Sequence, residues 1–310
     1  MKTERIKEEI KKSYANIAKG NSQESSCSAA SGCCTTDEFG TSMSENYADV
    51  DGYEQDSDLS LGCGLPTETA NIHEGDTVVD LGSGAGNDAF IARRIVGESG
   101  KVIGVDMTPE MVERAAQNNQ KLGYENVEFL LGEIESMENV PANVADVVIS
   151  NCVMNLVPDK VKAFEEVHRI LKAGGHFSIS DIVYVGTLPK GIAEAAEMHA
   201  GCISGASEKG AYLGTIKSAG FKNMKIKKER RIELPDRLLR KYVSPKALDQ
   251  FKQTDSGIYS ITIYADKLDE GACCEATESG CCANEPTAAE RSSDNSCCGT
   301  PSFTQDSICC

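Results

Sequence analysis

Positive charge is scarce in this sequence of 310 residues, which carries 31 Lys and Arg against 48 Asp and Glu. The net charge is −17, and no stripe of basic residues offsets it. Because binding to a phosphate backbone depends on clustered Lys and Arg, we expect no nucleic-acid partner. Long apolar runs are missing as well, and a transmembrane helix needs roughly 20 such residues, so we expect no membrane partner.

The N-terminal segment, MKTERIKEEIKKSYANIAKG, contains no apolar stretch of the kind found in a secretory signal peptide. We therefore expect a cytoplasmic protein, and we expect it to act as a monomer. Histidine is also rare, with four residues scattered along the chain, and no His-Asp or Ser-His arrangement is visible. We interpret these histidines as structural or surface residues.

Cysteine, in contrast, is abundant, with 14 residues. In the absence of an export signal, we expect thiols available for metal, metalloid or redox chemistry rather than a disulfide framework. The distribution is uneven, because the C-terminal segment holds four adjacent Cys-Cys pairs and the N-terminal segment holds Cys27, Cys33 and Cys34. The remaining three, Cys63, Cys152 and Cys202, lie in the part of the chain that resembles a folded core.

The composition divides the chain into four parts. Residues 1–46 combine a predicted amphipathic helix over 3–19 with a Ser- and Cys-rich segment. The helix has one apolar stripe, so we expect it to dock on another part of the protein. Residues 47–185 and 186–268 alternate short β-branched runs with helical stretches, which predicts an α/β fold with a doubly wound, mainly parallel sheet. Residues 269–310 form an acidic tail that we expect to be disordered without a bound ion. The seven predicted strands cover residues 77–81, 101–106, 127–131, 146–150, 176–183, 223–228 and 257–265.

A glycine-rich turn, VVDLGSGAGND, ends the first predicted strand. Glycines there let the backbone approach a ligand at the edge where open α/β sheets bind. The spacing is G-x-G-x-G, and Asn87 stands where a dinucleotide fingerprint needs its third glycine, which argues against a pyrophosphate cofactor. The residues of this turn expected to contact a ligand are Asp80, Gly82, Ser83 and Gly84.

Two further segments complete a nucleoside pocket. Asp106 ends the second predicted strand, where a carboxylate accepts the hydroxyls of a ribose. After the third strand, the segment GEIE places Ile134 and Glu135 near an adenine edge. Acidic residues around a glycine turn suit adenosine joined to a cationic amino acid, so S-adenosylmethionine is the predicted cofactor. A purely structural β-turn-α unit is the alternative interpretation.

The three core cysteines are far apart in the sequence, in the segments LGCGLP, SNCVMNL and AGCISGA. The segments of Cys152 and Cys202 belong to parts that meet over the carboxyl edge of such a sheet, and the turn with Cys63 can fold back there. A cysteine is also often a buried, inert apolar residue. From the residues alone, both interpretations stay open.

The motifs GCGLP, DLGSGAGND, G-x-I-E, SNCVMNLVPDK and GCISGA occur in the order and approximate spacing of the arsenite S-adenosylmethionine methyltransferases, which this chain resembles in detail over residues 63–206. The resemblance implies a class I methyltransferase fold with an inserted arsenic-binding segment. It also implies that Cys63, Cys152 and Cys202 are the catalytic, arsenic-binding residues. The positions that match the family's cofactor residues are Asp80, Gly82, Ser83, Gly84, Asp106, Met107, Ile134, Glu135 and Asn151.

The chain departs from the family pattern at three positions. Leu61 stands where Tyr is frequent, Asn87 where Arg is common, and Glu133 where an aromatic residue is common. The change at Leu61 puts one stacking or hydrogen-bonding contact near the cofactor in doubt. None of the departures removes a thiol.

The implied reaction transfers methyl groups to arsenite and methylarsenite held by thiolates, which are the preferred ligands of soft ions. The arsenic lone pair is the nucleophile, so the site needs positioning and a dry pocket rather than a general base. Methyl transfer formally oxidises arsenic, so a thiol reductant of the glutathione or thioredoxin type is expected as co-substrate. Cys33 and Cys34 are candidates for a redox relay.

Two other functions stay open. One is a class I methyltransferase for a small organic molecule such as a quinone, in which the core cysteines are structural. The other is a thiol-rich protein that sequesters arsenic or another metal. The tail cysteine pairs could capture arsenite for the core, bind a soft metal independently or be dispensable, and zinc is disfavoured because no C-x-x-C pair or His ligand accompanies them.

Overall fold

The structure is a computed structural model that describes residues 2–20, 45–187, 205–233, 240 and 244–268. The strands within these ranges are β1 (Thr77–Leu81), β2 (Lys101–Asp106), β3 (Val127–Leu131), β4 (Ala145–Asn151), β5 (Leu171–Val185), β6 (Ser207–Glu208), β7 (Lys222–Arg231) and β8 (Gly257–Asp266). The helices are α1 (Lys2–Ala18), α3 (Pro66–Thr69), α4 (Asn87–Val96), α5 (Pro109–Leu122), α6 (Lys160–Ile170), α8 (Lys209–Ser218) and α10 (Pro245–Lys252), with 3₁₀ turns η1 (Gln55–Ser57) and η2 (Met154–Leu156).

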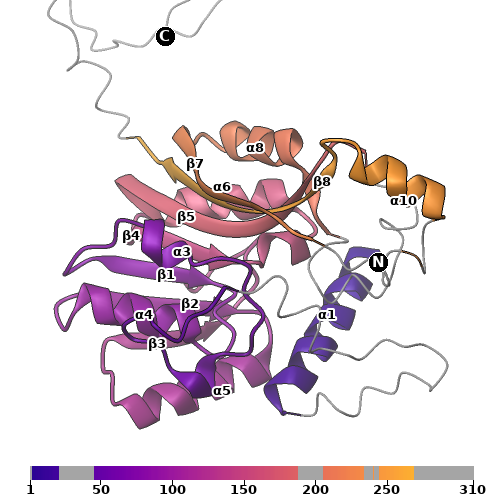
Figure 1. Cartoon of the computed structure of the whole chain (residues 1–310). Coiled ribbons are helices and arrows are strands. Elements are labelled where there is room, and N and C mark those ends of the chain that lie inside the picture. The colour runs from indigo at the N-terminus through magenta and orange to yellow at the C-terminus, as the bar shows by residue number, and fades with distance from the viewer. Residues whose placement is uncertain (1, 21–44, 188–204, 234–239, 241–243, 269–310) are drawn as a thin grey trace, which may run out of the picture. The chain divides into compact units, whose positions relative to one another are not determined.

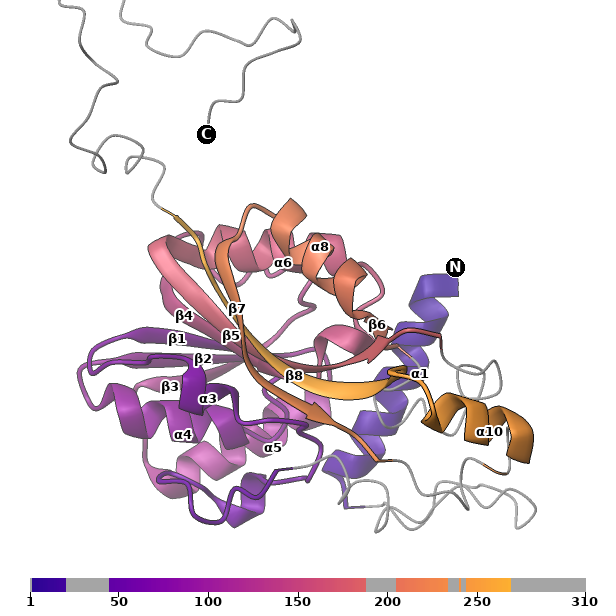
Figure 2. The same ribbon diagram turned by 45° about the horizontal axis from the view of Figure 1, so that its top comes forward.

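The sheet runs in the order β3-β2-β1-β4-β5-β8-β7, and the short strand β6 pairs with β5 outside this path. Strands β1 to β5 are parallel, whereas β8 lies antiparallel between β5 and β7 (Figure 2). The doubly wound α/β fold predicted from the sequence is therefore confirmed. All seven predicted strands form, and β6 is an addition. Most of the predicted inserted segment lies outside the described residues.

Helices cover both faces of the sheet, with α4 and α5 on one side and α6 and α8 on the other (Figure 1). The β-branched runs of the strands explain this, because alternate side chains point to opposite faces. In β1, Val78 packs in one apolar cluster with Phe90 of α4, and Val79 packs in the other with Phe164 of α6. Truncating a fully buried ring such as Phe164 to Ala would cost about 3–5 kcal/mol of folding free energy.

The direction of winding reverses between β1 and β4, which are neighbours in the sheet although a long stretch of chain separates them. Their carboxyl ends lie side by side, with Leu81 opposite Ser150. Open α/β sheets bind ligands at this switch point, where loops of opposite winding diverge and leave a crevice. The glycine turn follows β1 and Cys152 follows β4, so both open onto the same crevice.

The N-terminal helix α1 docks at this edge, as its apolar stripe indicated. It packs along α5, and Arg114 of α5 donates to the carbonyl of Ala18 at the end of α1 over 3.0 Å. Lys7 bonds to Glu133 over 2.7 Å and to Glu135 over 3.0 Å. The helix is therefore tied to the carboxyl ends of the strands by charge as well as by packing.

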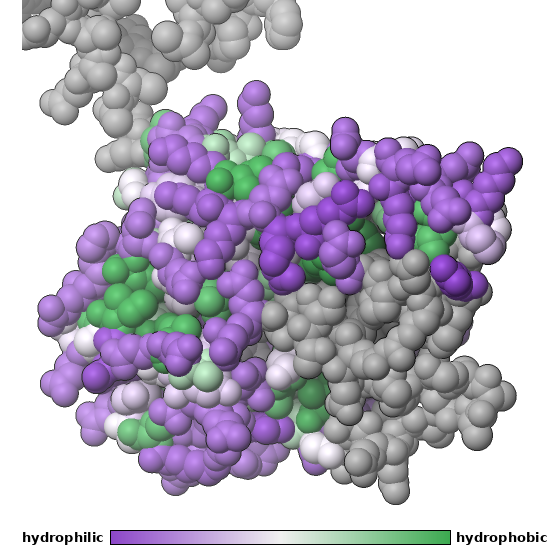
Figure 3. Space-filling view, viewed as in Figure 1, coloured by the Kyte–Doolittle hydropathy of each residue, from purple (hydrophilic) through white to green (hydrophobic). Residues whose placement is uncertain are grey.

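Within the described ranges, no helix is long and apolar enough to span a bilayer. The face in Figure 3 is mainly hydrophilic. The large apolar side chains exposed in the described part are separated along the chain. They are Ile95 of α4, Leu131 of β3, Val161 of α6 and Leu268, which follows β8. All described residues belong to one compact unit that ends at Glu270. The boundaries predicted after residues 46, 185 and 268 stay predictions.

Candidate active site

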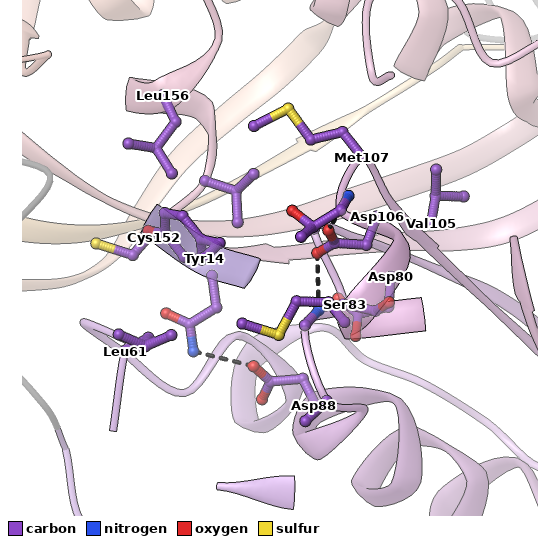
Figure 4. Close-up of a pocket in the computed structure, with 18 of the residues that line it drawn as sticks. Tyr14, Leu61, Asp80, Ser83, Asp88, Val105, Asp106, Met107, Cys152 and Leu156 are labelled. Carbon is purple, nitrogen blue, oxygen red and sulfur yellow. Dashed lines mark hydrogen bonds between the residues drawn. The ribbon is translucent and has the colours of Figure 1, made fainter. Parts of the chain in front are cut away.

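One pocket lies at the switch point, and all nine residues predicted to hold the cofactor line it. Figure 4 shows Asp80, Ser83 and Asp106 on one side of this pocket and Cys152 and Leu61 on the other. The pocket thus brings together the ends of β1, β2 and β4, the segment after β3 and the loop before α3. The role of each residue in binding stays a prediction.

The glycine turn positions Asp106. Gly84 adopts a φ of 51°, in the left-handed region that suits glycine, and nothing lies within 4 Å of the position that a Cβ would take. Its N–H donates to Asp106 Oδ2 over 3.0 Å, and the Thr108 N–H donates to Asp106 Oδ1 over 2.8 Å. Two backbone donors therefore fix the carboxylate that is predicted to accept the ribose hydroxyls.

Three buried polar atoms of pocket-lining residues have no hydrogen-bond partner in the described structure. They are Asp80 Oδ2, Ser83 Oγ and Asn87 Oδ1. Buried polar atoms almost always have partners, and an orphan costs about 1–3 kcal/mol. A bound molecule that carries hydrogen-bond donors would satisfy them, so the residues present fit a polar cofactor such as S-adenosylmethionine.

Three carboxyl groups give this pocket its electrostatic character. Burial raises the pKa of Asp80 well above its usual value, and the nearby charges of Asp88 and Asp106 raise it further. Burial also raises the pKa of Asp88 to about 6, although hydrogen bonds from Asn151 and Tyr47 oppose the change. Burial also raises the pKa of Asp106, although the hydrogen bonds from two backbone N–H groups oppose the change. A positively charged ligand would lower the free energy of all three ionised carboxylates.

Asp88 is the centre of a network that the sequence analysis missed. The Tyr47 hydroxyl donates to Asp88 Oδ1 over 3.1 Å and also lies 2.9 Å from the Gly64 carbonyl. The amide of Asn151 donates to Asp88 Oδ2 over 3.0 Å. Asp88 directly follows the glycine turn, so its position in the first turn of α4 was a usable signal. Tyr47 offered no signal, because it lies 41 residues away in sequence.

Two of the three predicted thiols lie in the described structure, and both are buried. Cys152 is 3% exposed, follows β4 and lines the pocket. It has a φ of 62°, unusual for a residue with a side chain, and its N–H donates to the Ser180 carbonyl over 2.8 Å. Cys63 is fully buried, and its N–H donates to the side chain of Asn151, the neighbour of Cys152, over 2.9 Å.

Asn151 connects the two segments that carry these thiols. Its side chain accepts from the Cys63 N–H over 2.9 Å, and it directly precedes Cys152 in the sequence. The structure therefore brings together two segments that are far apart in sequence.

The remaining predicted thiols lie outside the described residues. These are Cys202, the relay candidates Cys33 and Cys34, and the paired cysteines of the tail. Within the part of the chain that the structure describes, no group of three or more His, Cys, Asp or Glu side chains could hold a metal ion. Cys63 and Cys152 are accordingly the two predicted arsenic ligands whose surroundings are known.

Helix α1 supplies pocket residues that were not predicted, Lys7 and Tyr14. The sequence indicated that this helix docks but not where. In the GEIE segment, Gly132, Ile134 and Glu135 line the pocket. Glu133 instead forms ion pairs with Lys7 and Lys11 of α1. Lys7 also contacts Glu135, so α1 closes the side of the pocket predicted to receive adenine.

The sheet order and the pocket at its switch point define a methyltransferase domain, and a family model described as a methyltransferase domain matches residues 72–229. Arsenite methyltransferases are among the relatives. That of Halobacterium salinarum is 41% identical over 72% of this chain and 59% of its own length. That of Aquipseudomonas alcaligenes is 30% identical over 81% of this chain and 71% of its own length.

A solved structure agrees with these relatives. The arsenic(III) S-adenosylmethionine methyltransferase from Chlamydomonas reinhardtii is 35% identical, with a TM-score of 0.58, over 67% of this chain and 68% of that one. This chain belongs to the arsenite methyltransferase family, which confirms the resemblance seen in the sequence. It spans 59% of the length of the Halobacterium relative and 43% of that of the mouse relative.

Proposed function

We propose that this protein transfers a methyl group from S-adenosylmethionine to trivalent arsenic held by Cys63, Cys152 and Cys202. One observation carries the proposal. Cys152 lines the pocket that contains all nine predicted cofactor residues, and Cys63 is bonded to the residue next to it. A thiophilic substrate on these sulfurs would therefore sit beside the cofactor.

The cofactor side of the pocket suits a nucleoside with a cationic amino acid. Bound there, S-adenosylmethionine supplies an electrophilic methyl group on a positively charged sulfonium. Asp106 is held by two backbone donors and can accept ribose hydroxyls. Asp80 and Ser83 carry buried atoms without partners, which can bind the polar groups of the ligand. The raised pKa values of Asp80 and Asp88 indicate carboxyl groups whose ionised form needs a nearby cation.

The thiol side suits arsenic(III). Sulfur is its preferred ligand, and each cysteine that binds gives its proton to the hydroxide or thiolate that it displaces. Two or three sulfurs hold arsenic in a pyramid whose lone pair points away from them. Cys63 and Cys152 are both buried, and Leu61, Val153 and Leu156 give the pocket apolar walls, which exclude water. Positioning can lower the barrier by about 7–11 kcal/mol in well-oriented reactions, so no general base is required.

The substrates proposed are arsenite and methylarsenite. Transfer forms an arsenic–carbon bond and breaks the bond from carbon to sulfonium sulfur, which formally oxidises arsenic by two electrons. A thiol reductant of the glutathione or thioredoxin type returns two electrons and becomes a disulfide. Cys33 and Cys34 stay candidates for relaying these electrons.

The other two functions considered from the sequence gain no support. A protein that only sequestered arsenic would not need a cofactor pocket, whereas the buried acidic groups of this pocket suit a cationic nucleoside. The relatives described above are arsenite methyltransferases, which does not favour an organic substrate.

The full-length protein should be incubated with arsenite, methyl-labelled S-adenosylmethionine and excess thiol, and the arsenicals separated by chromatography. We expect label in methylated arsenic and an equal amount of S-adenosylhomocysteine. If no labelled arsenical forms under well-reduced conditions, while the protein binds S-adenosylmethionine, the proposed substrate is wrong.

A further inference from the structure

Cys63 is held at both of its backbone polar atoms by side chains from distant strands. Its N–H donates to Asn151 Oδ1 over 2.9 Å, and its carbonyl accepts from Ser260 Oγ over 2.6 Å. Asn151 ends β4, whereas Ser260 lies in β8, 197 residues from Cys63 in sequence. Loop backbone is usually left to water, so these two bonds immobilise one particular residue.

The glycines on either side of Cys63 permit this close approach. A Cβ on Gly62 would lie 2.7 Å from Asn151 Nδ2, and a Cβ on Gly64 would lie 2.5 Å from Ser180 Oγ. Neither glycine has a positive φ, so it is the lack of space, and not the backbone conformation, that requires them. The Gly-Cys-Gly segment is therefore seated directly against the end of β4 and the interior of β5.

The amide of Asn151 is fully used by the protein. Its Oδ1 accepts from the N–H groups of Cys63 and Gly64 over 2.9 and 3.3 Å. Its Nδ2 donates to the Gly64 carbonyl over 2.8 Å and to Asp88 Oδ2 over 3.0 Å, and it contacts the Tyr47 hydroxyl. An amide offers two donor hydrogens and two acceptor lone pairs, so none is left for a ligand.

We propose that Asn151 and Ser260 are positioning residues that preorganise the thiol of Cys63 for the arsenic atom that Cys152 also binds. Asn151 precedes Cys152, so one side chain ties together the two segments that carry the thiols. Its contribution is then to substrate binding, which differs from the cofactor contact that the family resemblance implies for Asn151. This inference deepens the proposed function and rests on it, because a thiol needs such positioning only if it acts as a ligand.

The test compares Ser260→Ala with Ser178→Ala. Ser178 is a matched control, because its buried hydroxyl donates over 2.9 Å to the carbonyl of Pro66, at the start of α3, rather than to the backbone of Cys63. The dissociation constant for arsenite is measured from sulfur–arsenic absorbance, that for S-adenosylmethionine by calorimetry, and stability by thermal unfolding. We expect Ser260→Ala to weaken arsenite binding about tenfold, while Ser178→Ala does not, and both to keep cofactor affinity.

A conservative variant and a second position make the result decisive. Ser260→Thr retains a hydroxyl and should restore arsenite affinity. Should Ser260→Ala not fold, Asn151→Ala is measured in the same way, and the proposal requires it to lose more affinity for arsenite than for the cofactor. Equal losses in Ser260→Ala and Ser178→Ala, or a loss of cofactor affinity alone in Asn151→Ala, would overturn the proposal. If the wild-type protein itself fails to bind arsenite, the proposed function is wrong, and this inference with it.

Discussion

The cofactor side and the thiol side of the pocket are built in different ways. The cofactor side comes mainly from one β-turn-α unit and the end of β2. Backbone groups shape it, because the Gly84 N–H donates to the carboxylate of Asp106. The thiol side takes Cys63 and Cys152 from separate segments, and the side chain of Asn151, the neighbour of Cys152, accepts from the Cys63 N–H. The proposed cofactor site is therefore encoded locally, whereas the proposed substrate site depends on contacts between distant parts of the chain.

The largest expected effect comes from removing one thiol and leaving the cofactor side intact. Cys152→Ser replaces a soft sulfur with a hard oxygen, so arsenic loses a ligand and its position relative to the methyl group. We expect arsenite methylation to fall about 100-fold or more. Affinity for S-adenosylmethionine, measured by calorimetry, should change little. Turnover close to that of the wild type would instead favour an organic substrate and purely structural cysteines.

The reverse experiment disturbs the cofactor side alone. In Gly84→Ala the new methyl group meets no atom within 4 Å, but it narrows the pocket. The backbone φ of 51° suits glycine, so alanine there strains the turn by about 1 kcal/mol. We expect cofactor affinity to fall about tenfold while arsenite affinity is kept. Gly123→Ala is the matched control, because Gly123 has a φ of 70°, open surroundings and a position at the end of α5. Equal loss of cofactor affinity in both variants would contradict the prediction.

Asp88 accepts from the side chain of Asn151 at the boundary between the two sides. Its contribution to the free energy of unfolding should depend on pH. Its pKa in the folded protein is about 6, above the 3.8 of an exposed Asp, because burial disfavours the charged form. The folded state therefore holds this proton more tightly, and the associated stability is lost as the pH rises through 6. In the ligand-free protein, the free energy of unfolding of Asp88→Asn relative to wild type should increase by about 1–2 kcal/mol from pH 5 to pH 8.

Chemical denaturation at the two pH values measures this difference. A difference between the two proteins that stays constant with pH would show that burial does not raise the pKa of Asp88. Addition of S-adenosylmethionine should reduce the difference, because its positive charge stabilises the ionised carboxylate in the wild-type protein.

The smallest expected effect concerns helix α1 at the margin of the cofactor side. Lys7 forms partly buried ion pairs with Glu133 and Glu135, so Lys7→Ala should weaken cofactor binding about two- to fivefold. The difference should shrink in high salt, which screens such pairs. Lys12→Ala removes the same charge from an exposed position on α1 and serves as control. Equal effects of the two substitutions would indicate only a change in net charge.

The contrast between the two sides also explains what could be predicted. The glycine turn and Asp106 were recognisable because their spacing along the chain reflects the geometry of one strand-turn-helix unit. The contacts of Tyr47 and Ser260 were not, since they act on groups 41 and 197 residues away. The docking of α1 was an intermediate case, because its apolar stripe predicted burial but not its ion pairs with Glu133 and Glu135.

The sequence by itself determined the doubly wound sheet, through β-branched runs separated by helical stretches, and it singled out Cys152, which lines the pocket. Only the tertiary structure decided that the segment of Cys63 lies against the end of β4, where Asn151, the neighbour of Cys152 in the chain, holds it. The physical reason is that hydrophobic periodicity and turn chemistry act over a few residues. The hydrogen bonds that hold Cys63, in contrast, form only after β4 and β8 have taken their places in the sheet.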